Sequence, residues 1–210
     1  MLPTRGIAAD PRPPPVNWKT APFTAALYDY AVQNRILSRV GARVLWGYDI
    51  DHLRDAIAAQ DTSALTLDIP CGGGIAVDDN PRHIAADISP TMLKRARRRT
   101  KSLLQTDIYA LPFGDATFDA CLTYNGLHCL DDPATAIREL TRVLRPGGTL
   151  TGTTITRGSG RDPLITLLQH QGSFGTPGTV TDLHTWLETA DLTDITLTPS
   201  GAVTAFTARK

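Results

Sequence analysis

The stretch "LTLDIPCGGGIAVDDN" at residues 65–80 indicates both a fold and a ligand site. It starts as an apolar β-run that contains one acidic residue, Asp68, and continues into three glycines. Glycine in such a loop lets the backbone approach a bound group that a Cβ would push away. Polar residues and Pro81 follow, so the sequence predicts a helix of only a turn or two after Gly74.

Around this stretch, short β-rich runs alternate with helical runs. The sequence predicts strands at 64–69, 83–88, 101–106, 118–124, 148–155, 192–198 and 202–208. Helix start signals lie between them, with Ser89, Asp132 and Thr181 as expected N-caps. The alternation predicts an α/β fold with a Rossmann-like, doubly wound, mostly parallel sheet of seven strands. Because only a three-residue "PSG" turn separates the last two strands, the last strand should be antiparallel.

The length of 210 residues suits one domain with a substantial core. Residues 1–20 are rich in proline and are expected to form a disordered tail. Apolar positions at helical spacing predict an N-terminal helical lid over 21–62, in front of a cofactor-binding sheet core at 63–210. The apolar lid helices are also candidates for a homodimer surface.

Bulk composition narrows the partners. Lys+Arg and Asp+Glu are equal at 21 each, so no nucleic acid or polyanionic substrate is expected. The basic run "KRARRR" at 94–99 lacks interleaved aromatic residues and is expected to be a solvated helix face. Neither a membrane insertion segment nor a secretory signal is recognisable, which predicts a cytoplasmic protein. The cysteines and histidines match no metal-ligand spacing, so no metal is predicted.

The second predicted strand ends in Asp87, which can accept hydrogen bonds from both hydroxyls of a ribose. A dinucleotide and S-adenosylmethionine both carry such a ribose. A dinucleotide also places its pyrophosphate on a helix N-terminus and favours Gly or Ala at the third loop slot, where this chain has Val77. S-adenosylmethionine carries no phosphate, so the short helix favours the methyl donor.

Four blocks occur in a fixed order: "LDIPCGGG" at 67–74, "ADIS" at 86–89, "TDIYALPFGDATFDACLTYNGLHCLDDP" at 106–133 and "ELTRVLRPGGTL" at 139–150. With them, residues 64–155 resemble the class I S-adenosylmethionine-dependent methyltransferases. The resemblance is greatest to the small-molecule branch, which includes enzymes that methylate quinones and other natural products. The end of the chain, 175–210, resembles the last helix and antiparallel strand of that family.

The resemblance implies a set of cofactor-binding positions, which are Asp68, Pro70, Cys71, Gly72, Gly74, Asp87, Ile88, Met92, Asp107, Ile108 and Asn125. In the family pattern Asp68 helps to anchor the amino end of the methionine moiety, and Asp87 holds the ribose. Ile88 and Met92 flank the adenine. The sequence departs from the pattern at Pro70, where a glycine is more usual, and in the short helix.

Few side chains need to react in methyl transfer, because positioning and exclusion of water supply much of the rate. His128 is the candidate general base, since it follows the fourth strand and imidazole titrates near neutrality. Tyr28, Trp46 and Tyr48 are candidates for contacts with the cofactor or the acceptor. Each of these four residues has a plain alternative, which is packing in the core.

The sequence therefore predicts a methyltransferase (transferase class) that moves a methyl group from S-adenosylmethionine to oxygen, nitrogen or activated carbon of a small molecule. Three alternatives stay open. Pro70 and the short helix suit a degenerate, non-catalytic cofactor-binding or scaffold protein. The shared topology suits an NAD-dependent oxidoreductase, and the basic run 94–99 suits methylation of a protein or RNA.

Overall fold

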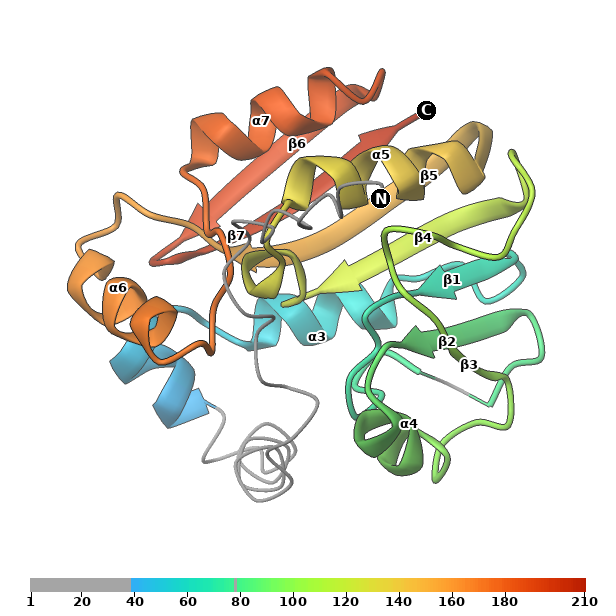
Figure 1. Ribbon diagram of the computed structural model, residues 1–210, viewed down its shortest axis with the longest axis horizontal. Coiled ribbons are helices and arrows are strands. Elements are labelled where there is room, and N and C mark those ends of the chain that lie inside the picture. Colours follow the sequence, from blue (N-terminus) through green and yellow to red (C-terminus); the bar gives the residue numbers. More distant parts are fainter. Residues whose placement is uncertain (1–38, 78) are drawn as a thin grey trace, which may run out of the picture.

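The computed structural model describes residues 39–77 and 79–210, and Tyr28 lies outside them. Its centre is a seven-stranded sheet in the order β3-β2-β1-β4-β5-β7-β6 (Figure 1). The pairs from β3 to β5 are parallel, whereas β7 is antiparallel to both β5 and β6. The predicted fold class is confirmed, including the antiparallel last strand.

Six of the seven strands begin within two residues of the predicted positions, and β5 begins four residues early. Their bounds are β1 Thr66–Asp68, β2 His83–Asp87, β3 Leu103–Gln105, β4 Phe118–Tyr124, β5 Leu144–Ile155, β6 Thr193–Ser200 and β7 Val203–Arg209. The early start of β5 takes in the "RPGG" residues 145–148, where the register against β4 shifts.

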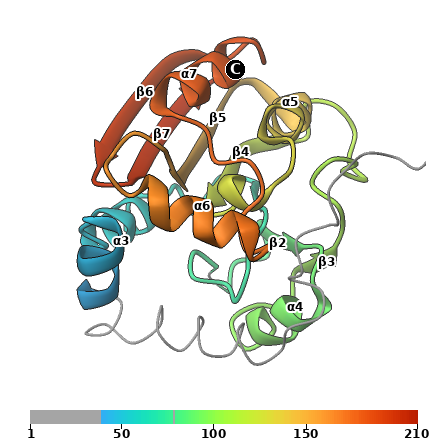
Figure 2. The ribbon, with the colours of Figure 1, turned by 60° about the vertical axis from the view of Figure 1, so that its left-hand side comes forward.

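Two helical layers cover the sheet. On one face, α5 (Pro133–Val143) packs on β5, and α7 (Val180–Glu188) packs on β6 and against α5. Both helices join the core cluster that contains Leu67, Cys121 and Leu150. The other face carries α4 (Pro90–Ala96) over β2 and α3 (Asp51–Ala58) over β4 and β5. The helix α6 (Asp162–His170) lies beside α3, because Ile165 joins the same apolar cluster (Figure 2).

Two of the three predicted helix starts are confirmed. The side chain of Ser89 accepts a hydrogen bond from the backbone N–H of Met92, and that of Asp132 accepts one from Thr135. The prediction for Thr181 is wrong, because α7 begins two residues earlier. Thr179 is its N-cap, and its side chain and that of Asp182 each accept the other residue's backbone N–H. This reciprocal capping box outweighs the signal at Thr181.

The helix predicted after Gly74 is absent. Between β1 and β2 the described residues form only turns and bends. The C-terminal end of α4 backs the loop in its place: a Cβ on Gly74 would lie 3.3 Å from both Ala96 Cβ and Arg99 Cδ. Cys71 and Val77 of the loop join the apolar cluster of α4. The loop therefore has no helix dipole of its own to offer a phosphate.

The described part of the predicted lid packs on the sheet. The segment around η2 (Ala42–Trp46) is fixed to the tip of the β6–β7 hairpin, since Ala202 N donates to Trp46 O at 2.7 Å. Tyr48 and Leu53 belong to the cluster over β4 and β5. Val40, Val44 and Leu45 are exposed. The lid and homodimer assignments stay predictions, because residues 21–38 lie outside the described part.

Replacing the N-cap of α7 tests the corrected helix start. Thr179→Ala removes both side-chain hydrogen bonds to Asp182 and should lower the free energy of unfolding by about 1 kcal/mol. Thr181→Ala, inside the first turn, is the matched control and should change it by less than about 0.5 kcal/mol. Urea denaturation of the two variants measures both values. A larger loss for Thr181→Ala would contradict the assignment.

Candidate functional site

The carboxyl ends of β1 to β4 bring the predicted cofactor residues to one edge of the sheet. The loop after β1 has left-handed backbone at Gly72 (φ +54°) and Gly74 (φ +84°), a conformation that favours glycine. Cys71 N donates to Ala86 O at 2.8 Å, so the loop is joined to β2. This edge, outside the carboxyl ends of parallel strands, is where open α/β sheets bind ligands.

The side chain of Asp87 links the glycine loop to the end of β2 and the start of α4. Its Oδ2 accepts the backbone N–H of Gly72 at 2.9 Å, and its Oδ1 accepts that of Ser89 at 2.8 Å. The side chain is buried, and burial raises its pKa although the backbone N–H groups oppose the shift. The carboxylate thus closes the glycine loop onto β2 and starts α4.

Asp68 is the second buried carboxylate at the edge, and it is only 2% exposed. Its Oδ2 forms no hydrogen bond within the described residues and lies 3.7 Å from Nε2 of His83. Burial raises the pKa of Asp68, whereas His83 acts in the opposite direction. The charge of Asp68 also adds to the pKa rise of Asp87. The edge therefore holds two buried carboxyl groups that influence each other's surroundings.

The residues expected around the adenine follow β2 and β3. Met92 and Ile108 are buried, whereas Ile88 is 37% exposed. Asp107 is exposed, and its Oδ1 accepts the backbone N–H of Tyr109. These four residues thus follow the ends of β2 and β3, and their roles in binding stay predictions.

Pro70 interlocks with the loop after β4. A Cβ on Gly126 would lie 2.4 Å from Pro70 Cγ, so only glycine fits against this proline. The preceding residue, Asn125, has φ +54° and is held by Thr153, whose backbone O and Oγ1 both accept from Asn125 N. The unusual proline of the glycine motif is therefore matched by a glycine in the neighbouring loop, and the two loops pack as a unit.

His128 lies in η3 (Leu127–Cys129), just after β4, and it is 5% exposed. Its Nδ1 accepts the backbone N–H of Ile155 at 3.3 Å, and its ring packs edge-on against Phe174 at 4.6 Å. Burial lowers the pKa of His128 to about 3. The ring is therefore neutral, and its contacts give it a structural task. The base role stays a prediction.

Trp46 and Tyr48 both pack in the apolar cluster over β4 and β5. Trp46 stacks on Phe174 at 5.9 Å, so Phe174 lies between Trp46 and His128. Tyr48 is 4% exposed, and burial raises its pKa to about 12. Nearby, Tyr124 at the end of β4 accepts a hydrogen bond from Gln60. These contacts show packing for both Trp46 and Tyr48, and their contact with a ligand stays a prediction.

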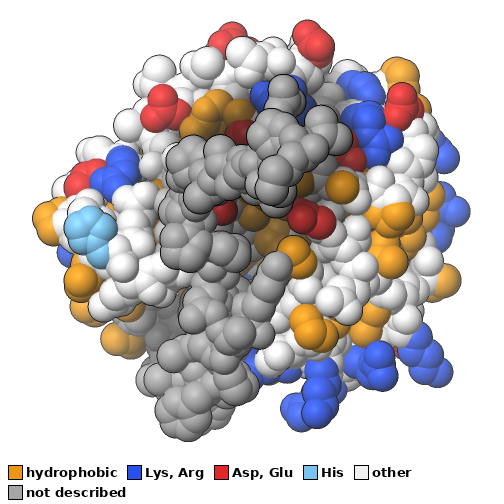
Figure 3. All heavy atoms as spheres, in the orientation of Figure 1, with side chains coloured by type: hydrophobic (Ala, Val, Ile, Leu, Met, Phe, Trp, Pro, Cys, Tyr) orange, Lys and Arg blue, Asp and Glu red, His pale blue; other side chains and the backbone are white. Residues whose placement is uncertain are grey.

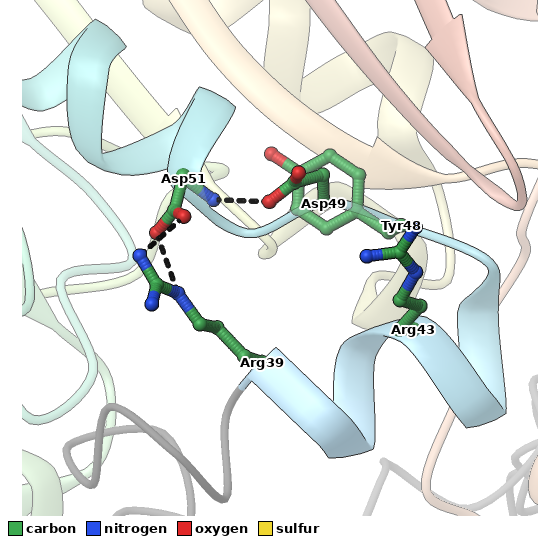
Figure 4. Close-up of a pocket in the computed structure, with 5 residues that line it drawn as sticks. All are labelled: Arg39, Arg43, Tyr48, Asp49 and Asp51. Carbon is green, nitrogen blue, oxygen red and sulfur yellow. Dashed lines mark hydrogen bonds and ion pairs between the residues drawn. The ribbon is translucent and has the colours of Figure 1, made fainter.

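A separate hollow of about 330 Å³ lies in the N-terminal segment, between η2 and the start of α3 (Figure 4). It is lined by Arg39, Arg43, Tyr48, Asp49 and Asp51. Asp51 pairs with Arg39 at 2.6 Å, so these charges largely compensate each other. Tyr48, a candidate for contact with a ligand, lines this hollow, whereas none of the predicted cofactor positions from Asp68 to Asn125 does.

The cysteines, the possible metal ligands and the basic run are the remaining candidates for a chemical role. Burial raises the pKa of Cys71, and it raises that of Cys129 to about 12, so neither is an activated thiol. In residues 39–77 and 79–210 no group of three or more His, Cys, Asp or Glu side chains could hold a metal, and no helix could cross a membrane. The Lys and Arg side chains of the basic run 94–99 belong to the end of α4 and the residues that follow it, where basic side chains gather on the surface (Figure 3).

The sequence did not reveal three contributors to this edge. His83 was considered only as a metal ligand, yet strand alternation places it on the face of β2 that carries Asp87. Gly126 carried no signal of its own, because its constraint comes from Pro70. Phe174 belongs to a segment without periodicity, so only the fold shows that it reaches His128.

A doubly wound sheet in this strand order, with a glycine loop and an acidic second-strand end, defines a Rossmann-like nucleotide-cofactor fold. Residues 67–151 match the sequence model of the methyltransferase domain family. Sequence and fold agree in this likeness, because the matched residues run from strand β1 through β4 and most of β5 in a sheet of the class I methyltransferase type.

Individual relatives point the same way. The chain is 35% identical over 140 residues to the ubiquinone/menaquinone biosynthesis C-methyltransferase UbiE of Enterobacter sp. (strain 638), which covers 61% of this chain and 55% of that protein. The chain spans about half the length, or less, of the curated relatives that it matches.

Solved structures show the same fold at low identity. A S-adenosylmethionine-dependent methyltransferase from Thermotoga maritima has a TM-score of 0.66 at 16% identity, over 86% of this chain and 98% of its own. Human N-acetylserotonin methyltransferase, solved with S-adenosylmethionine, has a TM-score of 0.56 at 20% identity, over 75% of this chain and 51% of its own.

The contact between Pro70 and Gly126 can be tested by a Cβ. Gly126→Ala should lower the free energy of unfolding by about 1–3 kcal/mol, because the new methyl group overlaps the proline ring. Gly114→Ala is the control, since its Cβ would meet only Thr117 Oγ1 at 3.8 Å. Denaturant unfolding measures both. Adding Pro70→Gly should restore part of the loss, and a Gly126→Ala protein as stable as the control would refute the interlock.

The pKa of His128 predicts a pH dependence of stability. A buried histidine with a pKa of about 3, against 6.5 for the free side chain, binds protons less readily in the folded state. Its share of stability is therefore complete above about pH 6.5 and is lost as the pH falls towards 3. Compared with His128→Gln, the wild type should lose roughly 2 kcal/mol more between pH 7 and pH 5.

Unfolding of both proteins at several pH values measures this difference. The buried carboxylates Asp68 and Asp87 have raised pKa values, so their effect has the opposite sign, but it is common to both proteins and cancels. Parallel pH profiles for the wild type and the variant would contradict the burial of a neutral ring.

Proposed function

We propose that this chain is an S-adenosylmethionine-dependent methyltransferase that methylates a small organic acceptor. The observation that carries the proposal is the pair of buried carboxylates, Asp68 and Asp87, on either side of a glycine loop without a helix. The methyltransferase relatives support it. The quinone acceptors named for those relatives make an apolar, ring-shaped acceptor the first class to test.

The charge of the edge supports a cationic ligand over an anionic one. The pyrophosphate of a dinucleotide would face two carboxylates and would find no helix N-terminus between β1 and β2. A sulfonium with an ammonium group carries the opposite charge and has ribose hydroxyls to donate to Asp87. The residues present therefore fit the methyl donor, which supports the preference that the sequence gives through Val77.

The bound donor would supply an electrophilic methyl group, and the residues of the chain would position it. Asp87 would hold the ribose, the backbone at Gly72 and Gly74 would lie against the methionine part, and Asp68 would bind the amino end. Because the displacement consumes a positive charge, a site that excludes water and aligns the acceptor favours it. The chain needs no acid of its own at this step.

The acceptor would approach from the side of Trp46, His128 and Phe174. These side chains come from the N-terminal segment, the loop after β4 and the segment after α6, which meet at the carboxyl ends of β4 and β5. A wall built from aromatic rings suits a flat, apolar acceptor. His128 would help mainly by shaping this wall, because its Nδ1 is occupied by Ile155 N.

Calorimetric titration with S-adenosylmethionine, S-adenosylhomocysteine and NAD tests the proposal. The first two should bind at micromolar levels and NAD should not. Asp87→Ala should weaken binding at least about tenfold, since it removes a charge-assisted contact. Asp55→Ala, which removes an exposed carboxylate on α3, is the control and should leave binding unchanged. Failure of all three ligands to bind would favour the scaffold alternative instead.

A further inference from the structure

The pair Asp68 and His83 is the one buried acid–histidine contact at this edge that the proposed function leaves unexplained. Asp68 is 2% and His83 4% exposed, and Asp68 Oδ2 lies 3.7 Å from His83 Nε2. This distance is too long for a good hydrogen bond. The histidine therefore faces the carboxylate without saturating it, and Asp68 Oδ2 keeps its capacity to accept.

The sheet register explains why these two side chains meet. Asp68 pairs with Ala85, and Thr66 pairs with His83, in the parallel ladder of β1 and β2. Side chains alternate along a strand, so His83 and Asp87 share the face of Asp68. His83 thus lies diagonally across from Asp68, on the side away from the ligand edge, where it can contact the carboxylate from behind.

On this face of the sheet, the Asp68–His83 pair does not belong to the apolar core. Two apolar clusters cover this face, one with Leu122 and Tyr124 and the other with Ala85 and Leu93. The acid–histidine pair lies on β1 and β2, outside both clusters. A buried, incompletely paired charge is costly, which calls for a functional reason.

Among the described residues, His83 is the group that favours the ionised form of Asp68. Burial raises the pKa of Asp68, and the nearby His83 acts against this rise. The other titratable groups that sense Asp68 are Cys71, Asp87 and Tyr124. All three are acids, so none of them can offset its negative charge.

We propose that His83 is a positioning residue that keeps Asp68 ionised and in place to bind the ammonium group of a ligand's amino-acid end. This inference rests on the proposed function, because it concerns how that site recognises the methionine part of the donor. It specifies that the pair acts on ligands that carry an α-amino acid end. It should have little effect on the nucleoside part, which lies with Asp87.

Binding of two related nucleosides distinguishes this positioning role from a purely structural role of His83. S-adenosylhomocysteine carries the amino-acid end, whereas 5′-methylthioadenosine has the same nucleoside and thioether without it. We would titrate the wild type, His83→Gln, Asp68→Asn and the double variant with both ligands. His184→Gln is the control, because His184 is a surface histidine on α7 that pairs with Glu188.

His83→Gln and Asp68→Asn should each weaken S-adenosylhomocysteine binding about tenfold or more and methylthioadenosine binding less than about twofold. The double variant should be little weaker than Asp68→Asn alone, because His83 acts through Asp68. The S-adenosylhomocysteine affinity of His83→Gln should also rise with pH, as the buried carboxylate regains its charge. His184→Gln should bind both ligands as the wild type does.

Equal weakening for both ligands would show that His83 only supports the loop, and unchanged binding would show that it has no role. Either result overturns this inference while the proposed function stands. A wild type that binds neither nucleoside would overturn the proposed function as well. If His83→Gln does not fold, histidine ¹⁵N spectra of the wild type replace it: the His83 resonances should shift with S-adenosylhomocysteine and not with methylthioadenosine, and equal shifts would refute the role.

Discussion

The two hydrogen bonds accepted by the Asp87 carboxylate hold the ligand edge together. One, from Gly72 N, closes the glycine loop onto β2, and the other, from Ser89 N, fixes the start of α4. Both bonds need an acceptor, so they favour the ionised form against the burial that raises the pKa of the group. The protein thus keeps a carboxylate where the core alone would not favour one. Binding sites often contain such buried charged groups, which are kept at a cost in stability.

The missing helix after Gly74 changes what backs the glycine loop. Gly74 rests on Ala96 and Arg99, so the end of α4 takes the position that a helix of the loop itself would otherwise fill. The loop then contributes no helix dipole, and the field at the edge comes from Asp68 and Asp87. Helix-breaking residues after Gly74 therefore change the electrostatics of the proposed site. Two carboxylates without a helix N-terminus suit a cationic ligand better than a phosphate.

The sequence predicted the sheet well because its signals are local. Each strand is a short β-rich run, and Ser89 and Asp132 mark helix starts through neighbouring N–H groups. The site was predictable as far as the glycine loop and Asp87, which lie on the motif itself. The contacts of Pro70 with Gly126 and of Asp68 with His83 join segments that are distant in sequence, and no local pattern encodes them. Thr181 failed as a cap because Thr179, two residues earlier, had Asp182 at the right spacing.

The proposed acceptor side of the molecule is built from other segments than the proposed donor side. Residues 157–179 leave the sheet after β5 and return to it at a bridge between Arg157 and Thr179. Within this segment, the excursion from β5, Gly175 N donates to His128 O and Thr176 N donates to Leu130 O. These two hydrogen bonds join it to the loop after β4. The match to the methyltransferase domain family ends at residue 151, before the excursion begins. Changes in the excursion can therefore alter the wall around Phe174 without moving Asp68 or Asp87. A domain arranged in this way can keep one methyl donor while its acceptors diverge, so the acceptor has to be found by experiment.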